Sequence, residues 1–109
     1  MDSKKKIFII DDDSFLLDMY ALKFSQSNYE VTTALGSEPA LAKLKEGFVP
    51  DVMLLDIVMP VMDGFEFMEK IKEENLATNA TIIILSNRGQ PSDVARGEPL
   101  GAAGYIVKA

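Results

Sequence analysis

Residues 50–64 read PDVMLLDIVMPVMDG, and this stretch decides the fold. The run at 51–55 predicts a buried strand, and the strand ends in a carboxylate at Asp56. The next residues, 57–64, contain a proline and end in Asp-Gly, so they predict a loop. Apolar residues at helical spacing then predict a helix from about 65 to 74. A strand, a loop and a helix in this order form one β-loop-α unit.

The same unit recurs on both sides of this stretch. The strands are expected to be continuous apolar runs rather than alternating ones, which is typical of a parallel sheet covered on both faces. Strands alternating with helices predict an α/β fold, a doubly wound sheet of five parallel strands. A chain of 109 residues is enough for one domain, residues 1–109. The other expected strands lie at 6–10, 29–33, 81–85 and 104–107, and the other helices at about 14–25, from 37 onward and at about 91–98.

Composition excludes several functions. The chain has no Cys and no His, so it has no disulfide, no thiolate or His-ligated zinc site and no Ser-His-Asp triad. Its net charge of -6 argues against binding a nucleic-acid backbone as the main role. No apolar run approaches the roughly 18 residues that cross a bilayer. With no signal peptide recognisable at the start, a cytoplasmic protein without membrane contact is expected.

Polar side chains follow four of the expected strands. Asp11, Asp12 and Asp13 come after the first strand, Asp56 after the third, Ser86 after the fourth and Lys108 after the fifth. Parallel strands end at one edge of the sheet, where open α/β folds bind ligands. We therefore expect these residues, which are scattered over most of the chain, to meet in one pocket.

The charges of this pocket do not balance. Two carboxylates about 4 Å apart repel by roughly 4 kcal/mol at an effective dielectric of 20, and one lysine does not offset three of them. Either a carboxyl group holds its proton or a cation binds. Oxygen ligands without His or Cys favour a hard ion such as Mg²⁺. A carboxylate beside Mg²⁺ and a lysine is also a plausible phosphoryl acceptor.

The sequence resembles the receiver domain of bacterial two-component response regulators along its whole length. The segment at 50–64 is highly specific for that family, and the spacing between the matching segments also fits it. The other matching segments are KIFIIDDD at 6–13, IIILS at 82–86 and LGAAGYIVK at 100–108. The resemblance implies the flavodoxin-like strand order 2-1-3-4-5, known also from the chemotaxis member of this family.

The resemblance also implies a function, phosphorelay signal transduction. Asp56 would accept a phosphoryl group from a sensor histidine kinase, and Lys108 would pair with the phosphoryl oxygens. Ser86 would move in to donate a hydrogen bond to the phosphoryl group, and Tyr105 would rotate inward behind it, which makes these two the switch residues. The chain would then be a phosphoacceptor rather than an enzyme, limited to self-phosphorylation from small donors and autodephosphorylation.

A metal site follows from the same resemblance. Asp12 and Asp56 would ligate Mg²⁺ directly, together with the backbone carbonyl of Val58. Asp11 would assist, through a water molecule. The sequence predicts no other cofactor and no direct contact with nucleic acid.

The sequence departs from the family near its end. Family members usually have a proline in a cis bond after the lysine, whereas Lys108 is followed by Ala109 and a trans bond is expected. Gly97 and Pro99 predict a short fourth helix. Family members continue into a fifth helix, so a truncated form lacking that helix is expected. The sheet face left bare would favour self-association.

Two other functions stay open. Residues 9–14 resemble the strand and Asp-x-Asp start of a haloacid-dehalogenase-like phosphatase, which would use Asp11 as its nucleophile and Ser86 and Lys108 as its later motifs. That class needs further acidic residues after the lysine, and the chain ends first. An interaction module that is inert to phosphorylation is the other alternative. Taken alone, three aspartates before a helix are more often caps than ligands. Asp13 and Asp63 are expected to be helix caps.

Overall fold

The predicted alternation of strands and helices is confirmed. The structure is a computed structural model, and it describes residues 4–86 and 91–107. The predictions about Lys108 and about the bond that joins it to Ala109 lie outside the described residues. The elements are β1 (Lys5–Asp11), α1 (Ser14–Gln26), β2 (Tyr29–Leu35), α2 (Ser37–Lys45), β3 (Val52–Asp56), α3 (Gly64–Glu73), β4 (Thr81–Ser86), α4 (Pro91–Gly97), the 3-10 helix η1 (Glu98–Leu100) and β5 (Ala102–Val107).

The five strands form one parallel sheet in the order β2-β1-β3-β4-β5, as expected. Its register brings the polar strand ends together. Ile10 pairs with Leu55 between β1 and β3, so Asp11 and Asp56, the next residues, lie side by side at the edge of the sheet. Asp56 pairs with Leu85 between β3 and β4, which places Ser86 one residue further along the same edge.

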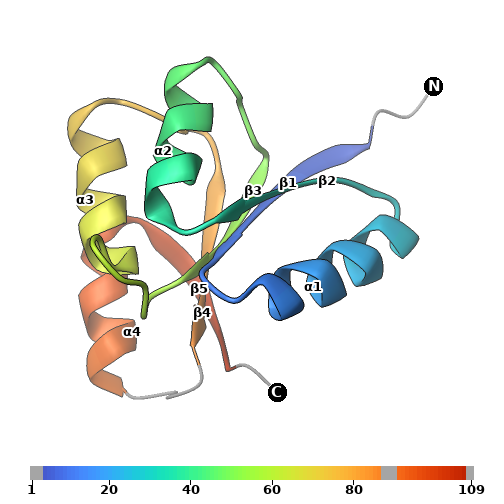
Figure 1. Ribbon diagram of the computed structural model, residues 1–109. Coiled ribbons are helices and arrows are strands. Elements are labelled where there is room, and N and C mark those ends of the chain that lie inside the picture. The colour runs from blue at the N-terminus through green and yellow to red at the C-terminus, as the bar shows by residue number, and fades with distance from the viewer. Residues whose placement is uncertain (1–3, 87–90, 108–109) are drawn as a thin grey trace.

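The helices cover the two faces of the sheet unequally. Figure 1 shows α2, α3 and α4 on one face and α1 alone on the other. The larger core cluster lies under the three helices, and the smaller one joins Leu17 of α1 to residues such as Ile9 and Leu54. Phe65, Met68 and Ile71 of α3 are buried in the larger cluster, as their spacing predicts. Burying these side chains holds α3 and the loop before it against the sheet.

The apolar spacing in α1 predicted a helix correctly, but not which side of it is buried. Leu17 is the buried residue of α1, and Tyr20 and Phe24 pack against the same core cluster while partly exposed. Phe15, Met19 and Leu22 are 73%, 44% and 62% exposed, and they lie on the opposite side of the helix. On β5, Ile106 is also 46% exposed. In the described part of the chain, no helix other than α1 covers this face of the sheet.

The fourth helix is short, as Gly97 and Pro99 predicted: α4 has seven residues and passes into η1. At Gly97 the backbone of α4 lies close to the sheet. A Cβ atom added there would lie 2.5 Å from Cδ1 of Ile84. Next to it, the guanidinium of Arg96 lies 4.3 Å from the centre of the Phe65 ring, a cation–π contact that ties α4 to α3.

Candidate functional site

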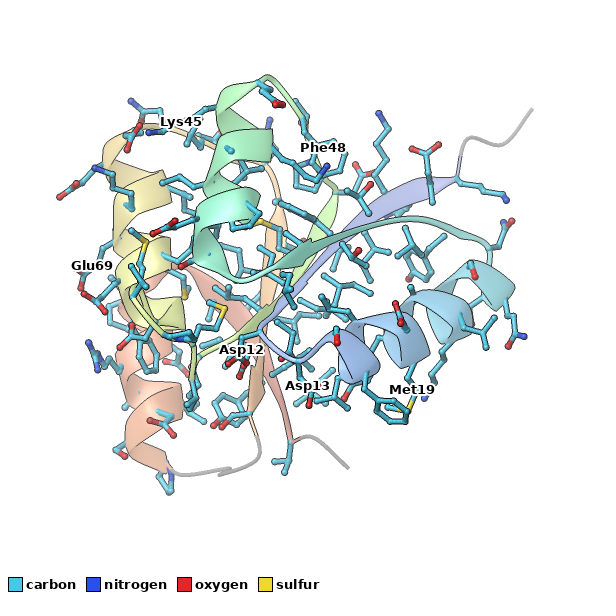
Figure 2. All side chains as sticks on the ribbon, viewed as in Figure 1. Asp12, Asp13, Met19, Lys45, Phe48 and Glu69 are labelled. Atoms are coloured by element: carbon cyan, nitrogen blue, oxygen red, sulfur yellow. The ribbon has the colours of Figure 1, made fainter. Side chains whose placement is uncertain are left out.

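Three carboxylates meet at the edge of the sheet where the strands end. One carboxylate oxygen from each of Asp11, Asp12 and Asp56 lies within 4.8 Å of the others. Asp11 and Asp56 are buried, and Asp12 is exposed at the mouth of the group. Figure 2 shows Asp12 at the end of the sheet and Asp13 beside it at the start of α1. The structure therefore brings together Asp11, Asp12 and Asp56, as the sequence predicted.

Local turns set the direction of the two buried carboxylates. Oδ1 of Asp11 accepts a hydrogen bond from the backbone N–H of Asp13 at 3.0 Å. Oδ1 of Asp56 accepts one from the N–H of Val58 at 3.3 Å. Both are turns in which an aspartate bonds the backbone two residues further on, a local preference of this residue type. These bonds fix the orientation of each carboxylate relative to the loop that follows it.

Asp13 caps α1, as predicted from the sequence. Its Oδ1 accepts hydrogen bonds from the N–H groups of Phe15 at 3.0 Å and Leu16 at 3.3 Å. The first turn of a helix has N–H groups without helical partners, and an aspartate at this position satisfies them. Capping thus explains the third aspartate, while Asp11 and Asp12 belong to the cluster.

The loop from Ile57 to Asp63 is closed at its neck. The N–H of Gly64 donates to the carbonyl of Ile57 at 3.0 Å. A Cβ atom on Gly64 would lie 2.5 Å from the carbonyl oxygen of Asp56 and 2.7 Å from Cα of Ile57. Asp63 and Glu66 form a capping box at the start of α3, with bonds of 2.9 and 3.1 Å. The importance of Gly64 was missed in the sequence, although the Asp-Gly pair that ends the loop is a signal for it.

Ser86 and Tyr105 lie on the two strands beyond β3. Ser86 is buried at the end of β4, next to Val107 of β5. The hydroxyl of Tyr105 donates a weak hydrogen bond to Oδ2 of Asp93 in α4 at 3.5 Å, longer than the usual range of about 2.5 to 3.0 Å. Asp93 is 8% exposed. Sequence reasoning did not single out this aspartate, because nothing local marks a helix residue that faces a tyrosine twelve residues later.

The charge of the cluster suits a hard cation. Two carboxylates 4.8 Å apart repel by roughly 3.5 kcal/mol at an effective dielectric of 20. Three convergent carboxylates, with no His or Cys in the chain, form an oxygen-only donor set, which Mg²⁺ prefers. The residues present therefore fit a Mg²⁺ ion.

The fold and the site together define a class of protein: a doubly wound α/β domain with an acidic pocket at the carboxyl edge of its parallel sheet. The sequence family model described as response regulator receiver domain matches residues 7–109. The chain belongs to this family, whose domains act in phosphorelay signalling. The resemblance seen in the sequence is thereby confirmed.

Curated relatives of similar sequence are transcriptional regulators. The chain is 34% identical over 108 residues to the probable transcriptional regulator ycf27 of Guillardia theta. It is 32% identical over 104 residues to the alkaline phosphatase synthesis transcriptional regulatory protein PhoP of Bacillus subtilis. These matches cover 99% and 95% of the chain, but only 41% and 42% of the relatives. The chain thus spans less than half the length of the curated relatives it matches.

Solved structures confirm the fold. The chemotaxis protein CheY4 of Vibrio cholerae superimposes with a TM-score of 0.89 at 31% identity, covering 97% of this chain and 88% of that one. The response regulator TrrA of Thermotoga maritima, solved in complex with Mg²⁺-BeF, has a TM-score of 0.81 at 30% identity, covering 96% of this chain and 87% of that one.

Among the described residues, no helix is long and apolar enough to span a membrane; α1, the longest, has 13 residues.

Proposed function

We propose that Asp56 is the phosphoacceptor of this receiver domain, and that Asp11, Asp12 and Asp56 hold the Mg²⁺ ion the reaction uses. The observation that carries the proposal is the convergence of these three carboxylates within 4.8 Å, at the end of two adjacent parallel strands. Asp56 is the central member by topology, because β3 lies in the middle of the sheet. Asp56 is 3% exposed, so it lies at the base of the cluster, whereas Asp12 is exposed.

The metal would be held by Asp12, Asp56 and the backbone carbonyl of Val58, with Asp11 acting through water. When bound, Mg²⁺ would neutralise the negative charge of the carboxylates and of the phosphoryl oxygens. Asp56 has its Oδ1 anchored by the N–H of Val58, which fixes the plane of the carboxylate. Holding the attacking group in one orientation lowers the barrier by pre-ordering the reactants.

The reaction is a phosphoryl transfer. A carboxylate oxygen of Asp56 forms a bond to phosphorus, and the bond from phosphorus to the leaving atom of the donor breaks. That atom, a histidine nitrogen of a sensor kinase or an oxygen of a small acyl phosphate, keeps the electron pair. The product is an acyl phosphate on Asp56, and Lys108 would pair with its oxygens. Self-phosphorylation from small donors and autodephosphorylation are part of the proposal.

The response to phosphorylation would run through Ser86 and Tyr105. Ser86 lies one residue beyond the partner of Asp56 in β4. Its hydroxyl would reach the phosphoryl group after a small movement. Tyr105 is half-buried on β5, and its hydroxyl bonds Asp93 of α4. A change at Ser86 and an inward rotation of Tyr105 would therefore alter the contact between β5 and α4. This is a local charge change that biases a two-state element.

The partners proposed are a sensor histidine kinase, as the phosphoryl donor, and a second copy of the chain. Self-association would use the sheet face beside α1, where Ile106 is exposed. The curated relatives are named as transcriptional regulators, and the chain matches 41% and 42% of their length. We propose no direct nucleic-acid contact for residues 1–109, and a cytoplasmic location.

The test is phosphorylation by acetyl phosphate with Mg²⁺, followed by mass spectrometry of the intact protein and of its peptides. We expect one added phosphoryl group on Asp56 and none in Asp56→Asn. Asp13→Asn is the matched control, because it makes the same chemical change beside the cluster and asparagine still caps a helix. It should be labelled like the wild type. Label on Asp11 would indicate the phosphatase chemistry, and no label in the folded wild type would indicate an inert module.

A further inference from the structure

The tip of the loop beside Asp56 contains a strained turn. The N–H of Met62 donates to the carbonyl of Pro60 at 2.8 Å, and φ of Val61 between them is 71°. This is a γ-turn whose central residue has positive φ, the rarer and more strained of the two kinds. Positive φ is unusual for any residue except glycine and is an outlier for a β-branched one. Among the described non-glycine residues with positive φ, Val61 alone is β-branched; the others are Asn28, Asn75 and Ala77.

Packing does not compensate for this strain. The side chain of Val61 is 83% exposed, the most exposed of the large apolar residues described. A glycine would adopt the same turn without strain, and a polar residue would be better solvated. The stability of the isolated domain therefore gives no reason for a valine here. Strained residues persist where the surrounding structure holds them, and they gather at functional sites.

The surrounding structure does hold the turn from both sides. The neck of the loop is closed by the bond from Gly64 to Ile57, and the side chain of Met59 is buried against the core. Pro60 has its own φ fixed by its ring, and it restricts the backbone of Met59 before it. From Val58 to Val61, each step of the backbone is thus restricted by a bond, a ring or a buried side chain.

We propose that Val61 is a positioning residue for the metal site. Val61 is the central residue of the strained turn, and this turn keeps the loop and the carbonyl of Val58 in one orientation before the metal binds. This inference rests on the proposed Mg²⁺ site. Mg²⁺ needs near-ideal octahedral geometry. If the loop were mobile, its carbonyl ligand would have to be ordered during binding, which would weaken the affinity for Mg²⁺. A β-branched residue held at positive φ has few neighbouring conformations, whereas glycine has many.

Two substitutions separate the restriction of the loop backbone by Val61 from the strain of its positive φ. Val61→Gly relieves the strain and frees the backbone, so the melting temperature should rise by about 4 to 8 °C while Mg²⁺ binds about two- to five-fold more weakly. Val61→Asn relieves much of the strain but keeps a side chain that tolerates positive φ. It should raise the melting temperature with less than a two-fold change in Mg²⁺ affinity. Opposite changes in stability and affinity are not expected from a residue that is only structural.

The measurement is a titration of the ¹⁵N-labelled protein with MgCl₂ at constant ionic strength, following amide shifts, together with thermal unfolding of the metal-free protein. ¹⁵N relaxation of residues 58–62 without metal gives a third readout, and larger motion is expected in Val61→Gly. Val49→Gly is the matched control, because Val49 is also exposed, at 63%, but lies in the loop before β3. It should leave Mg²⁺ affinity unchanged.

The outcomes are distinct. Weaker Mg²⁺ binding in Val61→Gly with larger loop motion, and near wild-type binding in Val61→Asn, supports the proposal. If the wild type binds Mg²⁺ and Val61→Gly binds it as tightly or more tightly, the positioning role is wrong but the metal site stands. Folded wild-type protein whose amides beside Asp56 do not respond to Mg²⁺ overturns the metal site and the positioning role together.

Discussion

Gly64 joins the loop after Asp56 to α3, and replacing it with alanine is the sharpest test of how that loop is closed. The added Cβ would lie 2.5 Å from the carbonyl oxygen of Asp56 and 2.7 Å from Cα of Ile57. Both are backbone atoms, which cannot move aside as the end of a flexible side chain can. Either the strand end or the start of the helix must shift, and the 3.0 Å bond from Gly64 to Ile57 is then strained or lost.

The size of the effect follows from these contacts. Overpacking a tight site costs about 1 to 3 kcal/mol, and losing a hydrogen bond costs about 1 kcal/mol more. Replacing glycine by alanine returns roughly 0.4 to 1 kcal/mol by restricting the unfolded chain. A net loss of about 2 kcal/mol is expected, which lowers the melting temperature of a domain this size by roughly 8 to 16 °C.

Thermal unfolding followed by circular dichroism measures this change. Gly104→Ala is the matched control, since a Cβ atom there meets only Ile83, at an ordinary 3.7 Å, and the residue lies in β5 without positive φ. Its melting temperature should be unchanged or slightly raised. If Gly64→Ala melts within 2 °C or so of Gly104→Ala, the neck of the loop is looser than described and the reasoning is wrong.

Three further predictions concern the rest of the chain. Asp63→Ala removes the cap shared with Glu66 and should cost about 1 kcal/mol in urea unfolding, whereas Asp63→Asn should cost little. The hydrogen bond from Lys70, with Lys45 nearby, lowers the pKa of Glu74. The stabilisation is therefore present above the pKa of Glu74 in the unfolded chain, and it is lost as the pH falls through the lowered pKa of the folded protein. Glu74→Gln should lower the melting temperature slightly at pH 7 but not near pH 2. An equal effect at the two pH values contradicts this. Light scattering at high concentration should give twice the mass of one chain for the wild type and the mass of a single chain for Ile106→Lys. A monomeric wild type contradicts self-association.

Periodicity and strand-end residues were enough to predict much of this protein. Continuous apolar runs such as the one at 51–55 indicated buried parallel strands, because both faces of such a strand are covered. An aspartate directly after such a run had to lie at the carboxyl edge of the sheet. The convergence of Asp11, Asp12 and Asp56 was therefore predictable without coordinates, and the structure confirms it. The roles of Ser86, Tyr105 and Lys108 stay predictions.

Some features were out of reach of sequence reasoning because they depend on contacts between distant residues. The spacing of apolar residues in α1 does not reveal that Phe15 and Leu22 face solvent, because the helix is apolar on both sides and only packing against the sheet selects Leu17. The bond from Tyr105 to Asp93 likewise requires α4 to lie over β5.

By itself the sequence determined the order of strands and helices, the single sheet and the edge at which the acidic residues gather, since these follow from local patterns and from the direction of parallel strands. Only the tertiary structure decided how the loop after Asp56 closes, why Gly64 is needed there and that Val61 is held at positive φ. The physical reason is that backbone conformation in a loop is set by its anchors. Those anchors, a neck hydrogen bond and a buried methionine, exist only once the sheet and α3 have come together.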